Sequence, residues 1–131
     1  MMLIETCVQP SAIHGMGLFT VAAIPRGTPV WKFLPGFDRE FSPEEFSSLP
    51  PRVQNHLRWF AFVDPAAGSW ILSGDHACFM NHSPAPNTGA LPGVSEPVVT
   101  VALRDLATGE ELICDYFAFD ANAAEKLGPK P

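Results

Sequence analysis

The chain has 131 residues, a length that fits one domain and leaves little room for a second. Hydrophobic residues make up 47% of it and charged residues 17%, which is typical of a globular protein and excludes an intrinsically disordered chain. The net charge of −6 argues against a nucleic-acid binder, because such a protein needs a basic surface for its phosphate contacts. The charge suits a cationic partner such as a lysine-rich peptide, or serves solubility alone.

The first third of the chain has the composition of short strands joined by turns. Residues 3–8 are the first predicted strand, and the apolar runs at 17–24 and 28–33 are the next two. Ile24-Pro25-Arg26-Gly27 joins those two runs, and proline second with glycine fourth is what a type I turn prefers. The fourteen prolines and ten glycines favour the same kind of structure throughout.

Two helices are predicted next. Ser42-Pro43-Glu44-Glu45 has the pattern of a capping box, with serine at the N-cap and glutamate three residues later. Pro50-Pro51 ends this helix, because proline cannot continue one. Residues 52–62 follow with apolar side chains at helical spacing, namely Val53, Leu57 and Phe60.

The second half returns to strands. The predicted segments are a loop at 64–68, strands at 69–74 and 97–106, a turn at 107–109 and a strand-like stretch at 110–119. One helical turn is predicted in the tail after residue 119, before it frays. The chain is therefore expected to be mainly β with a small helical region near residues 42–62.

The cysteines and the N-terminus limit the setting of the protein. Cys7, Cys78 and Cys114 are odd in number and widely spaced, which indicates neither a disulfide framework nor a zinc site and favours a reducing, cytoplasmic setting. No metal site is predicted, since His56 and His76 lack ligand-like spacing to each other or to the cysteines. The first ten residues lack the features of a signal peptide, and no window is apolar enough to cross a membrane.

Three stretches carry candidate functional residues. In His14-Gly15-Met16-Gly17 the two glycines let the backbone approach a ligand closely, or form an ordinary β-turn. In residues 79–88, Asn81 is able to bridge a backbone group and a ligand, although Asn and Pro are as common in surface turns. Residues 109–116 end at Tyr116, the only tyrosine beside ten phenylalanines, whose phenol is either functional or hydrogen-bonded at the edge of the core.

In this order and spacing the stretches resemble the SET domain, a family that transfers methyl groups from S-adenosylmethionine, usually to lysine. The matching segments are Gly15-Met16-Gly17-Leu18-Phe19, Ile24-Pro25-Arg26-Gly27, Phe79-Met80-Asn81-His82-Ser83 with Pro86-Asn87, and Glu111-Leu112 with Cys114-Asp115-Tyr116. The resemblance covers nearly the whole chain. Its compact form is similar to the stand-alone SET proteins of bacteria and large viruses.

The resemblance implies a fold. It is mainly β, a β-clip of short curved sheets, in a single SET domain over residues 1–131 with a helical insert at about 38–68 and a C-terminal tail at 117–131. It also implies a pseudoknot, in which the segment ending at Tyr116 threads against the segment that carries Asn81 and His82.

The resemblance also implies roles for particular residues. Tyr116 matches the catalytic tyrosine of the family, and no metal is needed. S-adenosylmethionine would be held by His14, Gly15, Met16, Gly17, Phe33, Asn81 and His82, and the substrate channel would be lined by Cys114, Phe117 and Phe119. The acceptor lysine must be neutral and aligned with the methyl group, so the site has to desolvate and orient it. A phenol oxygen then contacts the polarised methyl through weak C–H···O interactions.

The expected partner is a protein or peptide that presents a lysine, basic in character, with no direct binding to nucleic acid or membrane. The chain departs from the family pattern at Cys78 and Pro84, and it lacks the zinc-binding cysteines that close the lysine channel in many histone methyltransferases. Either the tail or a second copy of the chain, in a homodimer, must then cover the channel. Cys114 replaces a larger aromatic residue that limits methylation, which predicts multiple methylation.

Two other hypotheses stay open at this point. The first is a non-catalytic SET module that binds cofactor or a lysine-rich peptide as a sensor or scaffold; the joint presence of Asn81, His82 and Tyr116 argues against it. The second is a hydrolase built on Cys114, His82 and Asp115, which would require a thiol activated by a neighbouring base. Composition alone supports this second reading.

Overall fold

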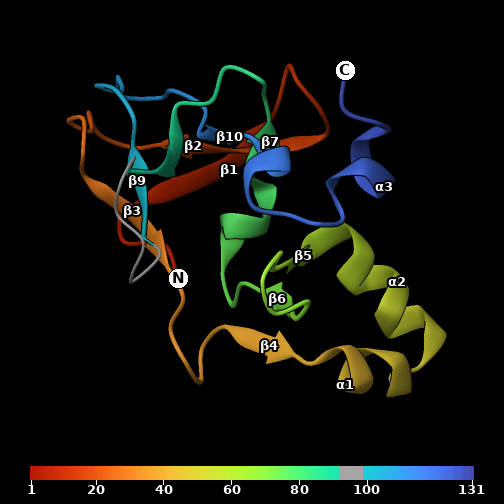
Figure 1. Ribbon diagram of the computed structural model, residues 1–131. Coiled ribbons are helices and arrows are strands. Elements are labelled where there is room, and N and C mark those ends of the chain that lie inside the picture. The colour runs from red at the N-terminus through yellow and green to blue at the C-terminus, as the bar shows by residue number, and fades with distance from the viewer. Residues whose placement is uncertain (92–98) are drawn as a thin grey trace.

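The computed structural model describes residues 1–91 and 99–131, and within these ranges its strands fall into four small sheets (Figure 1). β1 (Thr6–Pro10) and β2 (Met16–Thr20) form an antiparallel hairpin, and β7 (Asn81–His82) and β10 (Ile113–Cys114) a parallel pair. The two three-stranded antiparallel sheets are β3 (Pro29–Lys32), β9 (Val99–Ala102) and β8 (Thr88–Ala90), and β4 (Arg39–Phe41), β6 (Trp70–Leu72) and β5 (Phe62–Val63). The prediction of a mainly β chain with short sheets is confirmed.

The helices lie where the sequence predicts them. α1 (Pro43–Ser48) begins at a complete capping box, in which the Ser42 hydroxyl accepts from the Glu45 amide and the Glu45 carboxylate accepts from the Ser42 amide. The proline pair separates it from α2 (Pro51–Phe60), which carries a proline at its first position. α3 (Ala123–Leu127) is the predicted turn of helix in the tail. The 3₁₀ segments η1 (His76–Phe79) and η2 (Tyr116–Ala118) precede β7 and follow β10.

α2 packs through one of its three periodic apolar residues. Leu57 is 1% exposed, whereas Val53 is 40% and Phe60 39% exposed. The hydrophobic core beneath the helix is small. Leu57 packs there with Phe46 and Ala61, and Trp70 stacks on the Phe46 ring with centroids 4.0 Å apart. Phe60 does not pack into this core, and it lines the cavity of the candidate active site.

Two local predictions are wrong. The turn after Ile24 closes one residue later than predicted, because the Thr28 amide bonds to the Pro25 carbonyl and Gly27 adopts φ +83°, which suits the third position of a type II turn. The strand predicted at 110–119 is only the two residues of β10. It ends because the Asp115 carboxylate accepts from the Phe117 amide and caps a 3₁₀ turn in place of a further strand residue.

The remaining strand predictions hold with shifted ends. β1 lies at Thr6–Pro10 where residues 3–8 were predicted, and β6 occupies the middle of the predicted strand at 69–74. β9 matches the start of the predicted strand at 97–106, of which residues 97 and 98 lie outside the described residues. The chain leaves β9 early because Leu106 turns to pair its backbone with Ile24.

The larger core joins the sheets that surround the candidate residues. It contains Leu18, Ile24, Val30, Met80, Ala102, Leu106, Leu112 and Cys114, with Tyr116 and Phe119 packed against it. The small core under α2 forms a second centre in the lower part of the molecule (Figure 1). The helical part of the insert therefore has its own packing and is attached to the main domain through β4, β5 and β6.

The two segments that the pseudoknot prediction brings together are paired. β10 runs parallel to β7, with Ile113 opposite Asn81 and Cys114 opposite His82. The buried side chain of Asn87 holds this arrangement: its amide donates to the Glu111 carbonyl at 2.8 Å and its oxygen accepts from the Ile113 amide at 2.9 Å. Candidate residues that are thirty positions apart in the sequence thus lie side by side.

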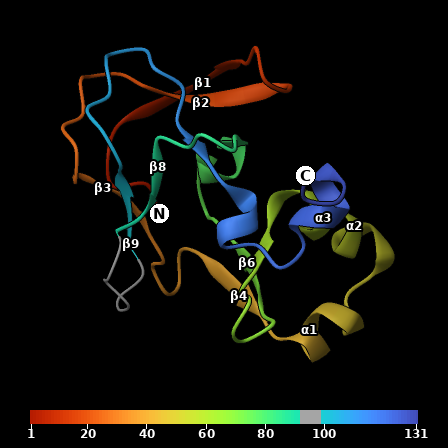
Figure 2. The same cartoon turned by 45° about the horizontal axis from the view of Figure 1, so that its top comes forward.

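The C-terminal segment lies against the end of α2 (Figure 2). The Ala121 amide donates to the Val63 carbonyl, and the Lys126 ammonium donates to the Ala61 carbonyl. α3 therefore packs beside the insert rather than extending into solvent. Within the described ranges, no helix has the length and apolar character needed to cross a membrane.

Candidate active site

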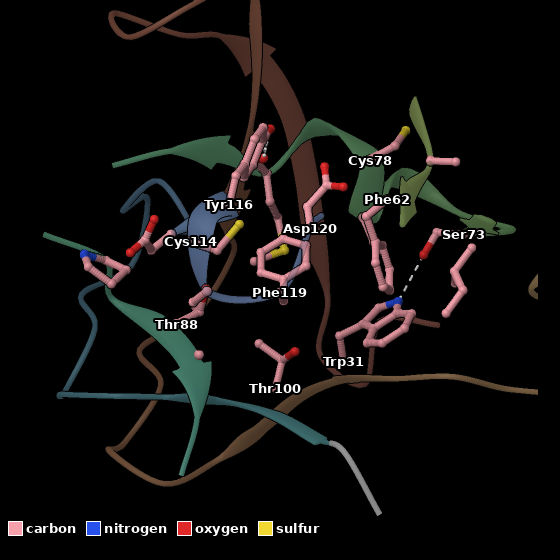
Figure 3. A pocket seen from close by; sticks show the side chains of 18 of the residues that line it. Trp31, Phe62, Ser73, Cys78, Thr88, Thr100, Cys114, Tyr116, Phe119 and Asp120 are labelled. Atoms are coloured by element: carbon pink, nitrogen blue, oxygen red, sulfur yellow. Dashed lines mark hydrogen bonds between the residues drawn. The ribbon is translucent and has the colours of Figure 1, made fainter. Parts of the chain in front are cut away.

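A cavity of about 400 Å³ lies between the β3-β9-β8 sheet, the insert and the C-terminal tail (Figure 3). Its size falls at the lower end of the range for small-molecule sites. The walls are mostly apolar and aromatic. Residues that line it include Trp31, Trp59, Phe60, Phe62, Cys78, Met80, Thr88, Cys114, Tyr116, Phe119, Asp120 and Lys126.

One wall of the cavity is a row of aromatic rings in edge-to-face contact. The Trp31 ring contacts Phe62 with centroids 6.1 Å apart, Phe62 contacts Phe119 at 5.3 Å, and Phe119 contacts Tyr116 at 6.0 Å. The indole N–H of Trp31 is satisfied by the Ser73 hydroxyl at 2.9 Å (Figure 3). The row joins β3, the insert and the tail, so residues from three parts of the sequence fix one apolar surface.

Tyr116 lies at the inner end of this row. Its hydroxyl donates to the Met80 carbonyl at 2.7 Å, which places the phenol directly before the strand that carries Asn81. Burial, followed by the neighbouring Cys114 and Asp120, raises the pKa of the phenol well above its ordinary value. The hydroxyl therefore stays protonated, with its hydrogen used by Met80 and its oxygen free to accept.

Cys114 is a buried thiol in the same wall. Burial, assisted by the charge of Asp115, raises the pKa of the thiol to about 12. A nucleophilic thiol needs a lowered pKa, so this environment opposes the hydrolase hypothesis. The Sγ atom contacts the Asn81 carbonyl at 3.9 Å, and Cys114 fills the position as a small hydrophobe.

The C-terminal tail supplies the outer wall. Asp120, 1% exposed at its side chain, accepts from the Val63 and Asn122 amides and forms an ion pair with Lys126 at 2.7 Å. The Lys126 ammonium also lies 5.7 Å from the centroid of the Tyr116 ring. The tail therefore forms part of the cavity through Phe119. Phe117, the other predicted channel residue, contacts His82 instead and is not among the residues that line the cavity.

Asn81 anchors the opposite side of Tyr116. Its side-chain amide nitrogen donates to the carbonyls of His14 and Met16, both at 3.1 Å, and to the Glu111 carboxylate at 2.9 Å. The side chain is thus the link between the loop at 11–16 and the β7–β10 pair. An Asn amide nitrogen has two hydrogens, and three acceptors surround this one. At least one of the three can therefore take a hydrogen bond from another donor.

His82 is held in one tautomer. Its Nδ1 atom accepts from the Tyr116 amide at 3.2 Å, which requires that Nδ1 carry no proton. The Asp115 carboxylate lies 3.6 Å from the same atom, too far for a hydrogen bond. Neutral His82 therefore has its proton on Nε2. In the hydrolase hypothesis His82 would activate Cys114, but its Nδ1 is already engaged with the backbone.

The glycines of the loop have separate reasons to be glycine. Gly15 has φ +48° and open space where a Cβ would lie, so its conformation requires it. Gly17 has an ordinary φ, but a Cβ there would collide with the Glu111 carboxylate and lie 3.0 Å from Ser11. The close approach that Gly17 permits is therefore to another side chain of the protein, whereas the sequence left open a ligand or an ordinary β-turn.

The loop fits the polar, amino-acid end of S-adenosylmethionine. The carbonyls of His14 and Met16 keep capacity to accept a further hydrogen bond, and residues 14–16 are exposed. None of these residues lines the apolar cavity, and Met80, which does, is the neighbour of Asn81 in the chain. Phe33 is half-buried just after β3 and, among the described contacts, no ring or hydrogen bond links it to this loop.

Sequence reasoning missed several residues of the site. Glu111 and Asn87 matched the motifs but received no role of their own, and the Asp120–Lys126 pair lies in a tail that showed no pattern. Trp31, not Phe33, is the aromatic residue of its strand that enters the cavity. The sequence predicted a strand at 28–33, but it did not show on which side of the sheet the cavity opens. Within the described ranges, no cluster of three or more His, Cys, Asp or Glu side chains is arranged to hold a metal ion.

Comparison with known proteins identifies the family. A family model described as the SET domain matches residues 15–117. This range covers most of the chain and includes Met16, whose carbonyl accepts from Asn81, and the segment that ends at Tyr116. The chain therefore belongs to the SET-domain family, in agreement with its motifs.

The individual proteins that the chain resembles have low sequence identity to it. The chain is 26% identical over 113 residues, 83% of its length, to a Plasmodium falciparum protein named "Putative histone-lysine N-methyltransferase 1", and it spans 2% of that protein's length. A crystal structure of a "putative histone methyltransferase" of the same organism has 19% identity and a TM-score of 0.58, covering 86% of this chain and 93% of that one. A humanized mutant of the Chaetomium thermophilum Polycomb Repressive Complex 2, bound to the inhibitor GSK126, has 22% identity and a TM-score of 0.65, covering 93% of this chain and 16% of that one.

Proposed function

We propose that the chain is an S-adenosylmethionine-dependent methyltransferase that acts on lysine in a protein or peptide. The observation that carries the proposal is the position of Tyr116. Its ring lines the apolar cavity while its hydroxyl bonds to Met80, the residue before Asn81 and His82. A single side chain therefore lies where a cavity for an acceptor meets a loop suited to a polar cofactor. Membership of the SET family and the names of the relatives support the same chemistry.

The polar loop and the apolar cavity would hold different reactants. S-adenosylmethionine supplies an electrophilic methyl group on a sulfonium centre. Asn81, His82 and residues 14–17 would hold it, with the His14 and Met16 carbonyls as acceptors for its ammonium group. The cavity strips water from an incoming amine, and desolvation lowers the pKa of a lysine so that its nitrogen is neutral. The Tyr116 oxygen, whose hydrogen is used by Met80, offers its lone pairs at this point.

The size of the Cys114 side chain bears on the number of methyl groups transferred. A thiol in the cavity wall leaves more room than an aromatic ring and offers no strong acceptor to hold an ammonium in one orientation. We therefore propose repeated transfer to the same lysine. The net charge of −6 supports a basic acceptor segment.

Binding and transfer test the proposal separately. Isothermal titration with S-adenosylmethionine should show one site per chain. Tritiated methyl transfer to a lysine-rich peptide should fall about a hundredfold or more in Tyr116→Phe, within the range found for removal of one positioned catalytic group, with cofactor affinity little changed. Thermal unfolding of the variant controls for loss of structure.

Two outcomes would count against the proposal. Absence of cofactor binding by the folded wild-type chain overturns the site assignment. Cofactor binding with no transfer to any lysine-bearing acceptor, equally in wild type and Tyr116→Phe, indicates the non-catalytic module instead.

A further inference from the structure

The loop between β1 and β2 is tied to a carboxylate about a hundred residues away. The Ser11 hydroxyl donates to Glu111, at 2.8 Å from one carboxylate oxygen and 3.0 Å from the other. The same hydroxyl accepts from the Ile13 amide at 2.9 Å, and the Ser11 amide donates to the Gly15 carbonyl. Glu111 thus holds the first residue of a small closed turn that carries the exposed backbone of the loop.

The same carboxylate also holds Asn81. One Glu111 oxygen accepts from the Asn81 side chain at 2.9 Å, shorter than the 3.1 Å bonds from that nitrogen to the His14 and Met16 carbonyls. A hydrogen bond to a charged acceptor is the strongest of the three. Because the nitrogen has only two hydrogens, this bond weakens its hold on the two carbonyls and leaves them able to accept from another donor.

The backbone of Glu111 is fixed independently of its side chain. The residue forms an isolated antiparallel bridge with Phe19, and the Leu112 amide donates to the Leu18 carbonyl at 2.7 Å. The side chain can therefore be changed without removing the strand contacts. The space it occupies is reserved at Gly17, where any Cβ would strike the carboxylate.

We propose that Glu111 is the positioning residue of the cofactor loop: its carboxylate sets Asn81 and residues 11–17 in the conformation that binds the amino-acid part of S-adenosylmethionine. The inference rests on the proposed function. Glu111 acts through Asn81 and Ser11, and none of its recorded contacts reaches the apolar cavity. Its removal should therefore weaken the cofactor and leave the acceptor unaffected.

The test compares Glu111→Ala, Glu111→Gln and the matched control Glu110→Gln. Glu110 is the preceding residue, and its partly exposed carboxylate pairs with Arg104 and accepts from the Ala107 amide and the Asn87 side chain. The control removes one negative charge from the same segment without removing a contact of Ser11 or Asn81. Glu111→Ala should raise the Kd for S-adenosylmethionine about tenfold or more, the scale of one lost charge-assisted hydrogen bond. Glu111→Gln retains an oxygen that can accept from Asn81 and should recover most of this loss. The KM for the lysine peptide should change less than about twofold in all three.

Clear outcomes overturn the inference. If Glu111→Ala binds S-adenosylmethionine with the wild-type Kd, the inference is wrong. It is also wrong if the cofactor Kd and the peptide KM rise together, which indicates a purely structural role. If Glu111→Ala fails to fold, Ser11→Ala decides, because it removes only a hydroxyl from an outer loop. It should raise the cofactor Kd about threefold or more, because the hydroxyl donates to Glu111 and accepts from the Ile13 amide, and no change overturns the proposal.

Failure of the proposed function is separable from failure of this inference. If the wild type does not bind S-adenosylmethionine, amide hydrogen exchange still measures how Glu111 holds the loop. Exchange at Ile13, whose amide bonds to Ser11, should be faster in Glu111→Ala than in wild type, because the carboxylate that fixes the Ser11 hydroxyl is gone. Equal exchange in the two proteins overturns the positioning role whatever the enzyme does.

Discussion

The two sides of Tyr116 are built from opposite kinds of contact. On the loop side, side-chain donors meet backbone carbonyls and a carboxylate within 2.8–3.1 Å around Asn81 and Ser11. On the cavity side, aromatic rings meet edge to face at 5.3–6.1 Å. Hydrogen bonds fix the orientation of a polar group, whereas apolar walls exclude water without demanding one orientation.

This difference matches the two partners that methyl transfer requires. A cofactor with a charged amino-acid end needs fixed donors and acceptors, and an amine nucleophile needs to lose its proton and its water. The boundary between the sides is narrow, since Met80 lines the cavity and Asn81 holds the loop. Changes on one side should therefore affect one partner only.

The largest effect is expected from the ion pair that closes the cavity. Asp120→Ala leaves the Lys126 ammonium, 9% exposed, without its carboxylate and removes the acceptor for two backbone amides. Removing one partner of a buried ion pair costs about 3–5 kcal/mol of folding free energy. Denaturant unfolding measures the loss. At a temperature where the variant is folded, the acceptor KM should rise and the cofactor Kd should stay near the wild-type value.

Glu125→Ala is the matched control for this change. It removes a carboxylate from an exposed position of α3, the helix that carries Lys126, and its effect on stability should stay within about 0.5 kcal/mol. If Asp120→Ala is no more destabilising than Glu125→Ala, the tail is not held by this pair. A change of cofactor Kd as large as that of acceptor KM would refute the separation of the two sides.

A second change alters the cavity by volume. Cys114→Tyr places a ring where the wild type has a small buried thiol. The second methyl transfer should slow about tenfold relative to the first, a difference of about 1.4 kcal/mol between the two barriers. Mass spectrometry of the peptide product over time gives the ratio. Cys114→Ala, which keeps the room, should retain multiple methylation. A wild-type enzyme that stops at one methyl group contradicts the prediction.

Alkaline pH should lower the stability of the folded protein through the buried groups on the cavity side. Burial raises the pKa values of Cys114, to about 12, and of Tyr116, so the folded protein keeps these protons after the unfolded chain has lost them. Stability from the thiol is complete below its unfolded pKa near 9 and is lost as pH rises toward 12. The loss should reach about 1 kcal/mol by pH 10.

Urea unfolding at pH 8, 9 and 10 measures this dependence. Cys114→Ala should flatten the curve, although Cys78, whose pKa burial also raises, contributes in the same direction. An unchanged slope in Cys114→Ala would show that the thiol is not protected in solution as its burial requires.

The sequence predicted those parts of the molecule whose causes are local. The capping box and the proline break depend on neighbouring residues, and both are present. The predicted strand at 110–119 is reduced to Ile113–Cys114, because Asp115 caps a 3₁₀ turn there. The candidate loop at 14–17 and the association of Asn81 with Tyr116 were implied by the resemblance to the SET family. Three side-chain placements were not predictable, because they depend on packing between distant segments. Gly17 makes space for Glu111, Trp31 and not Phe33 enters the cavity, and Asp120 pairs with Lys126.

The smallest effect is expected at the start of α1, which belongs to neither side. Ser42→Ala removes the N-cap hydroxyl that accepts from the Glu45 amide and should cost about 1 kcal/mol in stability. Ser47→Ala is the control: this hydroxyl bonds only to the Pro43 carbonyl one turn earlier, and alanine favours the helix, so stability should hold or rise slightly. Cofactor Kd and acceptor KM should match wild type in both. Because α1 packs into the small core with Leu57, a rise in acceptor KM in Ser42→Ala would mean that this core transmits strain through α2 to Phe60 and the cavity. The insert would then be part of the acceptor site and not only its support.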